Sequence, residues 1–142
     1  MIKMKEILAS KGHEIWSIGP DKTVLDALKL MAEKRIGALL VMEGERVNGL
    51  FSERDYARKV ILQGRASKDT LVSDVMTSRV ICSSLDHTAD ECMALMTEKR
   101  VRHLPIVENN KVVGLISIGD IVKAVISDQQ FTIDVLEKYI SS

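Results

Sequence analysis

The chain has 142 residues, enough for one compact domain or two very small ones. Its 20 basic and 20 acidic side chains cancel, which argues against nucleic acid or an anionic membrane as the main partner, because both attract a cationic surface. No apolar run approaches the roughly 20 residues that a membrane span requires.

The first fourteen residues, "MIKMKEILASKGHE", are charged throughout and lack the apolar stretch of a signal peptide. Cys82 and Cys92 have neither a metal-ligand spacing nor a CxxC spacing. Their pattern is typical of buried thiols in a reducing compartment. We therefore expect a cytoplasmic protein.

The first half contains patterns for six elements. They are a helical turn at 4–8, a strand at 15–18, a helix from Thr23, a buried strand at 38–42, a strand at 47–52 and a helix from Glu53. The helix after Thr23 has Val24, Ala27, Leu28 and Met31 at helical spacing. The two later strands flank "EGER", which predicts a hairpin turn.

The second half repeats the first. Residues 15–61 align without a gap on 80–126, and sixteen of the 47 paired positions are identical. The equivalent elements are a strand at 80–83, a helix from Thr88 with a Thr88-x-x-Glu91 capping box, a hairpin over 104–117 and a helix from Ile118. We infer an internal duplication of a β-α-β-β-α unit.

The polar stretch "QGRASKDT" at 63–70 is a linker by composition. We therefore expect one repeat with its lead-in at 1–66, a second at 67–127 with the lead-in "VSDVM", and a C-terminal helix at 128–142. That tail has Phe131, Val135 and Tyr139 at helical spacing, and it either covers its own domain or contacts a partner subunit.

One motif, Gly-Leu-x-Ser-x-x-Asp, occurs at 49–55 and again at 114–120. Ser followed by Asp at a helix start is close to a capping box, and the glycine allows close backbone approach. Retention of both Ser and Asp in both copies goes beyond what a cap demands. A hydroxyl, free N–H groups and a carboxylate at a helix start also suit a ribose and a phosphate.

These features resemble a known family. The doubled unit, the motif, "RVRHLPIV" at 100–107 and "DVMT" at 74–77 are similar to a tandem pair of cystathionine β-synthase (CBS) domains, a Bateman module, and to its small stand-alone bacterial members. The resemblance covers about residues 4–126. It implies an α/β fold of the α+β type, with two repeats packed about a pseudo-twofold axis.

The resemblance also implies two adenine-nucleotide sites, each shared between the repeats. The first contains Ser52, Arg54, Asp55, Val80, Arg102 and His103, and the second contains Ile15, Gly37, Ala38, Ser117, Gly119 and Asp120. The aspartates would hold ribose hydroxyls, and Arg102 with His103 would contact phosphate. Because Gly37 and Ala38 replace that basic pair, the Asp120 site must find its positive charge elsewhere.

No nucleophile elbow, phosphate-binding loop, dinucleotide fingerprint or metal cluster is present, and His87 lacks a recognisable catalytic neighbour, so we expect no enzyme, no catalytic cofactor and no metal. The favoured function is a regulatory module that binds AMP, ATP or NAD(H) and controls an unknown target. A dimerisation or docking protein with vestigial sites is the alternative, and a nucleotide-acting enzyme is the third class. A homodimer through Leu28, Met31, Ala32, Met93 and Met96 is expected.

Overall fold

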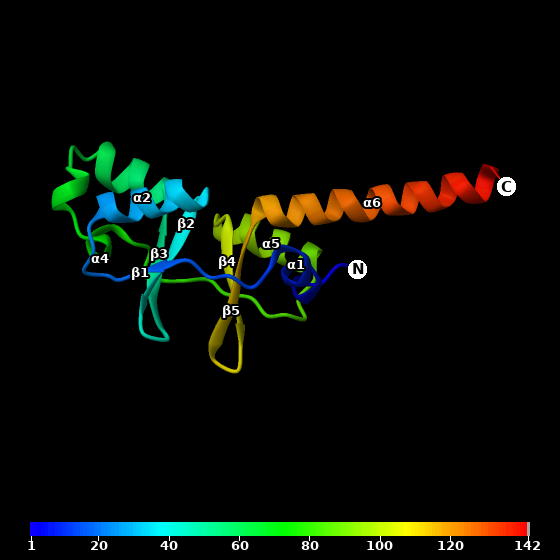
Figure 1. Cartoon of the computed structure of the whole chain (residues 1–142), viewed down its shortest axis with the longest axis horizontal. Helices are drawn as coiled ribbons and strands as arrows, with labels where there is room; N and C mark the ends of the chain where they lie inside the picture. Colours follow the sequence, from blue (N-terminus) through cyan, green and yellow to red (C-terminus); the bar gives the residue numbers. More distant parts are fainter. Residues whose placement is uncertain (142) are drawn as a thin grey trace. The chain divides into compact units, whose positions relative to one another are not determined.

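A computed structural model describes residues 1–141 and divides the chain into two compact units. Unit 2 is Ile15–Val80, and unit 1 combines Met1–Glu14 with the chain from Ile81 onward. Each unit contains a hairpin flanked by helices (Figure 1). The mixed α/β class expected from the sequence is confirmed.

Unit 2 is built from a three-stranded sheet and its helices. Its elements are β1 (Ser17–Ile18), α2 (Val24–Lys34), β2 (Ala38–Glu43), β3 (Arg46–Ser52), α3 (Glu53–Tyr56), the π-helical η1 (Ala57–Ile61), the 3-10 helix η2 (Ser67–Asp69) and α4 (Val72–Val75). The sheet order is β1-β2-β3, with β1 parallel to β2 and β3 antiparallel to it. Buried side chains of α2, β2 and α4 form the core with Phe51 and Val60.

Unit 1 holds the second hairpin and three helices. Its elements are α1 (Met4–Lys11), α5 (Ala89–Lys99), β4 (His103–Glu108), β5 (Lys111–Ser117) and α6 (Ile118–Ser141). The core joins buried residues of α1, α5 and the hairpin with Ile121 at the start of α6. The pairing of β4 with β5 places His103 opposite Ser117, just as Ala38 lies opposite Ser52 in unit 2.

The expected helix starts are confirmed. Thr23 accepts a hydrogen bond from the Asp26 amide at 3.1 Å, and Thr88 forms the full capping box with Glu91. Each cap satisfies an amide that would otherwise lack a partner in the first helical turn. The sequence therefore fixes where these two helices begin.

Each lead-in packs against the other repeat, so the packing does not follow the expected division of the chain between residues 66 and 67. Helix α1 lies in unit 1, where Met4, Ile7 and Leu8 are buried against the second repeat, and α4 packs in the core of the first repeat. In each case a repeat lacks one apolar face, and the lead-in of the other repeat covers it. The duplication predicted the elements but not this exchange.

Three further expectations differ from the structure. Residues 80–83 do not form a strand: Ser83 makes only an isolated bridge to Ile106. Met31 and Met96, two of the five residues expected at a dimer interface, are buried in the cores of their units, whereas Leu28, Ala32 and Met93 are at least partly exposed. The C-terminal segment is helical, as expected, but its helix does not begin at residue 128, because α6 continues unbroken from Ile118; residue 142 lies outside the described residues.

Candidate functional site

The Ser and Asp of the repeated motif form the same local structure in both units. Ser52 Oγ accepts from the Asp55 amide at 3.2 Å, and Asp55 Oδ2 accepts from the Ser52 amide at 3.0 Å. Ser117 and Asp120 form the equivalent pair of bonds at 3.1 and 2.8 Å. The capping role inferred from the sequence is therefore present twice.

The Asp55 carboxylate has further partners within unit 2. Its Oδ1 atom accepts a hydrogen bond from Thr77 Oγ1 at 3.0 Å and lies 3.2 Å from Lys59 Nζ. Its Oδ2 atom also accepts from the Ser52 hydroxyl at 3.1 Å. Asp55 is 7% exposed, so protein groups surround both of its oxygens.

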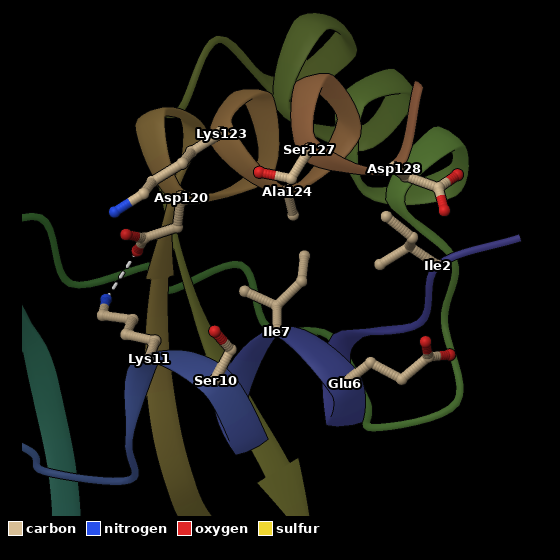
Figure 2. A pocket seen from close by; sticks show the side chains of 10 residues that line it. All are labelled: Ile2, Glu6, Ile7, Ser10, Lys11, Asp120, Lys123, Ala124, Ser127 and Asp128. Carbon is tan, nitrogen blue, oxygen red and sulfur yellow. Dashed lines mark hydrogen bonds and ion pairs between the residues drawn. The ribbon is translucent and has the colours of Figure 1, made fainter. Parts of the chain in front are cut away.

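Asp120 is more accessible and is held by a different cation. Lys11 Nζ, at the end of α1, lies 2.5 Å from Asp120 Oδ2 (Figure 2). It also donates to the Leu115 carbonyl at 2.6 Å. Burial raises the pKa of Asp120, but the bonds from Lys11 and Ser117 outweigh it, and the pKa lies below its ordinary value of 3.8. The carboxylate is thus held ionised by a residue of the lead-in.

The repeated glycines let each lead-in approach its hairpin closely. A Cβ at Gly49 would lie 2.7 Å from the Thr77 carbonyl oxygen and 2.7 Å from Met76 Sδ, and one at Gly114 would lie 2.5 Å from Leu8 Cδ2. The backbone groups of Leu50 and Thr77 also exchange hydrogen bonds of 2.9 and 2.8 Å. Close approach, one of the roles expected for these glycines, is confirmed.

A cavity of about 600 Å³ lies beside Asp120 within unit 1. Figure 2 shows its walls, formed by α1 on one side and the first three turns of α6 on the other. The lining is mixed: Ile7 and Ala124 are apolar, whereas Lys11, Asp120 and Lys123 provide charges at one end. This volume falls in the range of small-molecule sites.

The remaining predicted residues divide between the units. Unit 2 contains Ile15, Gly37, Ala38, Ser52, Arg54, Asp55 and Val80, and unit 1 contains Arg102, His103, Ser117, Gly119 and Asp120. Within a unit the middle strand lies beside its own motif: the Glu53 amide donates to the Gly37 carbonyl, and the Ile118 amide donates to the Arg102 carbonyl. The combinations across the units, such as Asp55 with His103, stay predictions.

His103 lies in the electrostatic environment of its own unit's aspartate. Burial lowers the pKa of His103 below its ordinary value of 6.5, the nearby charge of Lys11 lowers it further, and Asp120 opposes both effects. Arg102 lowers the pKa as well. The imidazole is therefore neutral at physiological pH and can accept a hydrogen bond as well as donate one.

Sequence reasoning missed three groups at these carboxylates. Thr77 lies in the quoted "DVMT" lead-in, but nothing marked its hydroxyl as the one that reaches Asp55. Lys59 follows Asp55 by four residues, a spacing that predicts an ion pair on a helix. Lys11 carried no signal, because it contacts a residue more than a hundred positions away.

His87 is not isolated, contrary to the expectation. Its Nδ1 atom lies 2.6 Å from Ser83 Oγ, which also lies 3.2 Å from Cys92 Sγ. Ser83 is 6% exposed, so this hydroxyl is not presented to a substrate. The contact stabilises the turn before α5, where the His87 amide donates to the Ser84 carbonyl.

Two kinds of site find no support in the part of the chain that the structure describes. Across residues 1–141, no group of three or more His, Cys, Asp or Glu side chains is placed to hold a metal ion. The helices of this region include none with both the length and the apolar character that a membrane crossing requires.

Comparison with known proteins agrees with this geometry. The CBS domain profile matches residues 5–61 and 72–127. A structure of a protein with CBS domains from Burkholderia ambifaria is 52% identical, with a TM-score of 0.86 over 89% of this chain and 96% of that one. The mitochondrial CBS domain-containing protein CBSX3 of Arabidopsis thaliana is 37% identical over 96% of this chain and 71% of its own length.

A more distant structure comes with a ligand. The CBS domain protein of Pyrobaculum aerophilum, solved in complex with AMP, shares the fold with a TM-score of 0.74 at 22% identity, over 84% of this chain and 89% of that one. The two profile matches span most of the chain, and each covers one hairpin with its Ser-x-x-Asp motif. The chain therefore belongs to the CBS domain family and contains a tandem pair of these domains.

Proposed function

We propose that this protein is a regulatory module that binds an adenine nucleotide, such as AMP, ATP or NAD(H), and acts through a ligand-linked change of conformation. Tandem CBS domains are regulatory modules, and a structural relative is complexed with AMP. The observation that carries the proposal is Asp120 at the edge of a cavity of about 600 Å³, held ionised by Lys11. It acts by binding and not by catalysis.

Each group at Asp120 suits one part of a nucleotide. The carboxylate accepts hydrogen bonds from ribose hydroxyls, and Ser117 lies beside it for the ribose or the first phosphate. Lys11 supplies a positive charge beside Asp120, so a phosphate group can replace part of the contact between Lys11 and Asp120. His103 adds a neutral hydrogen-bonding group nearby.

The experiment is calorimetric titration of AMP, ADP, ATP, NAD and NADH into the wild type, Asp120→Ala and Asp128→Ala. We expect Asp120→Ala to weaken binding by roughly 10- to 150-fold, because a charge-assisted hydrogen bond to a hydroxyl is lost. Asp128 borders the same cavity on the same helix but lies outside the motif, so its substitution should leave affinity nearly unchanged. Equal losses in both variants, or no binding by the wild type, would refute the proposal.

One observation favours the alternative of a docking protein with vestigial sites. Both Asp55 oxygens already contact Ser52, Thr77 or Lys59, so a ribose at this position must displace protein groups. If titration shows binding at neither aspartate while the protein still associates with a target, the docking function replaces the sensing function. One site per chain, abolished by Asp120→Ala, would mean that only the Asp55 site is vestigial.

A further inference from the structure

Helix α6 extends well past the domain that holds it. Its first turns pack through buried Ile121, but every described residue from 126 to 141 is exposed (Figure 1). This exposed part is rich in large apolar side chains, among them Ile126, Ile133 and Ile140 at 59%, 46% and 81% exposure. An apolar surface of this extent on one helix is typical of an interaction site.

Apart from Phe131, Val135 and Tyr139, which lie outside it, the large exposed apolar side chains of α6 follow a heptad repeat that also includes one glutamine. They are Val122, Ile126, Gln129, Ile133, Leu136 and Ile140, spaced alternately by four and three residues. We call this row the α6 seam. Isoleucine occupies the three a positions of the heptad (126, 133 and 140), and Val, Gln and Leu occupy the three d positions (122, 129 and 136). This is the pattern of a two-stranded coiled coil with a single polar layer. The seam spans about 27 Å of helix.

We propose that the α6 seam pairs with the α6 seam of a second copy of this chain, in antiparallel orientation. A twofold axis near Phe131 then places Val122 against the second copy's Ile140 and Ile126 against its Leu136. Gln129 meets the second copy's Ile133. Each contact occurs twice, as in any interface between identical surfaces.

The flanking residues select this orientation. On one flank, antiparallel pairing brings Lys123 next to the second copy's Glu137 and Gln130 next to its own equivalent. On the other flank it brings Val125 next to Tyr139. Parallel pairing instead sets Glu137 beside Thr132 and Gln130 beside Val125, with no opposite charges in contact. The charge pattern thus complements itself only in the antiparallel arrangement.

The pairing needs little ordering of the chain. Helix α6 is one continuous helix from Ile118, and its first turns pack against the core of unit 1. The nucleation that disfavours short isolated coiled coils is therefore already complete before association. The seam residues lie outside the Ser-x-x-Asp motifs and outside the cavity lining, and Lys123 on the flank is the one residue of this arrangement that also borders the cavity.

Light scattering of the full chain at tens of micromolar, a range set by typical interface affinities, tests the pairing. We expect a dimer of 15.8 kDa chains. Ile133→Lys should weaken the dimer on the order of a hundredfold, because two seam contacts receive a buried charge. Phe131→Lys is the matched control, since Phe131 is 68% exposed but faces away from the seam. A monomeric wild type, or equal weakening by both variants, overturns the proposal.

The charged flank gives a second test that leaves the seam intact. Lys123→Glu places like charges together and should weaken the dimer on the order of tenfold. Adding Glu137→Lys restores the opposite charges in exchanged positions and should restore the wild-type affinity. Failure of the double variant to recover, when its melting temperature equals that of the single variant, contradicts the antiparallel arrangement.

Disulfide trapping decides the orientation. In a background of Cys82→Ser and Cys92→Ala, chains with Val122→Cys should cross-link to chains with Ile140→Cys only when the two are mixed. Cross-linking of Ile140→Cys chains to themselves would show a parallel pair and overturn the proposal. Absence of any cross-link in the mixture would do the same.

Discussion

The two units contain the same motif but hold its aspartate in different ways. The Asp55 side chain is 9% exposed and is surrounded by Ser52, Thr77 and Lys59, whereas the Asp120 side chain is 25% exposed and has one cation from the lead-in. Burial with several partners makes Asp55 a structural group first. The duplication therefore kept the residues but allowed one copy to stabilise the fold and the other to remain accessible.

The largest expected difference between the units concerns their glycines. At Gly49 an added methyl group meets the Thr77 backbone carbonyl, which hydrogen bonds hold in place, whereas at Gly114 it meets only the end of the Leu8 side chain. We expect Gly49→Ala to reduce the free energy of unfolding by about 3 kcal/mol and Gly114→Ala by about 1 kcal/mol. Urea denaturation measures both. A larger cost at Gly114 would show that buried Leu8 is the less yielding neighbour.

The aspartates themselves should differ next. Asp55→Ala leaves Thr77 and Lys59 without their buried acceptor and should lower the free energy of unfolding by about 2 kcal/mol. Asp120→Ala loses mainly a helix cap and a partly exposed ion pair, so we expect about 1 kcal/mol. Asp128→Ala, at an exposed position of α6, should change it by less than about 0.5 kcal/mol. Equal costs for Asp55 and Asp120 would remove the distinction between the two units.

Lys11 tests the accessible unit through its ligand selectivity. Lys11→Met releases Asp120 for ribose but removes the charge that would meet phosphate, so affinity for ATP should fall relative to adenosine by on the order of tenfold. Lys123→Met is the matched control. Lys123 borders the same cavity as Lys11, but the ion pair with Asp120 is formed by Lys11. Competition titration measures the ratio. The same change in both variants would mean that the two lysines contribute alike to phosphate binding and that the contact of Lys11 with Asp120 gives it no special role.

Local patterns predicted most of the fold. Alternating and helical apolar spacing located both hairpins and the helices after Thr23 and Thr88, and the duplication supported each assignment with a second example. Capping boxes marked helix starts because their hydrogen bonds join residues three positions apart. These features depend on neighbours along the chain, so one sequence is sufficient to find them.

Contacts between distant segments were not predictable in the same way. The packing of α1 on the second repeat depends on which apolar face each unit lacks, and nothing in a linear pattern specifies this choice. The same exchange brings Lys11 to Asp120. Sequence reasoning identified the two carboxylates of the repeated motif but not Lys11 and Lys59, the cations that contact them.

The smallest expected effect is the pH dependence that His103 gives to unit 1. Because burial and Lys11 lower its pKa in the folded chain, the unfolded chain binds the proton more readily. The free energy of unfolding should therefore rise with pH in the window that ends near 6.5, the ordinary value, with a slope below the limit of about 1.4 kcal/mol per pH unit for one proton. Asp120, whose pKa is lowered from 3.8, contributes stability that is lost only at more acidic pH, so the two windows are separate. Urea titrations between about pH 5 and 7 should show a flatter dependence in His103→Gln than in the wild type. An unchanged slope in His103→Gln would mean that neither burial nor the charge of Lys11 lowers the pKa of this imidazole in the folded chain, and the proposed grouping of His103, Lys11 and Asp120 around one ligand would lose its electrostatic basis.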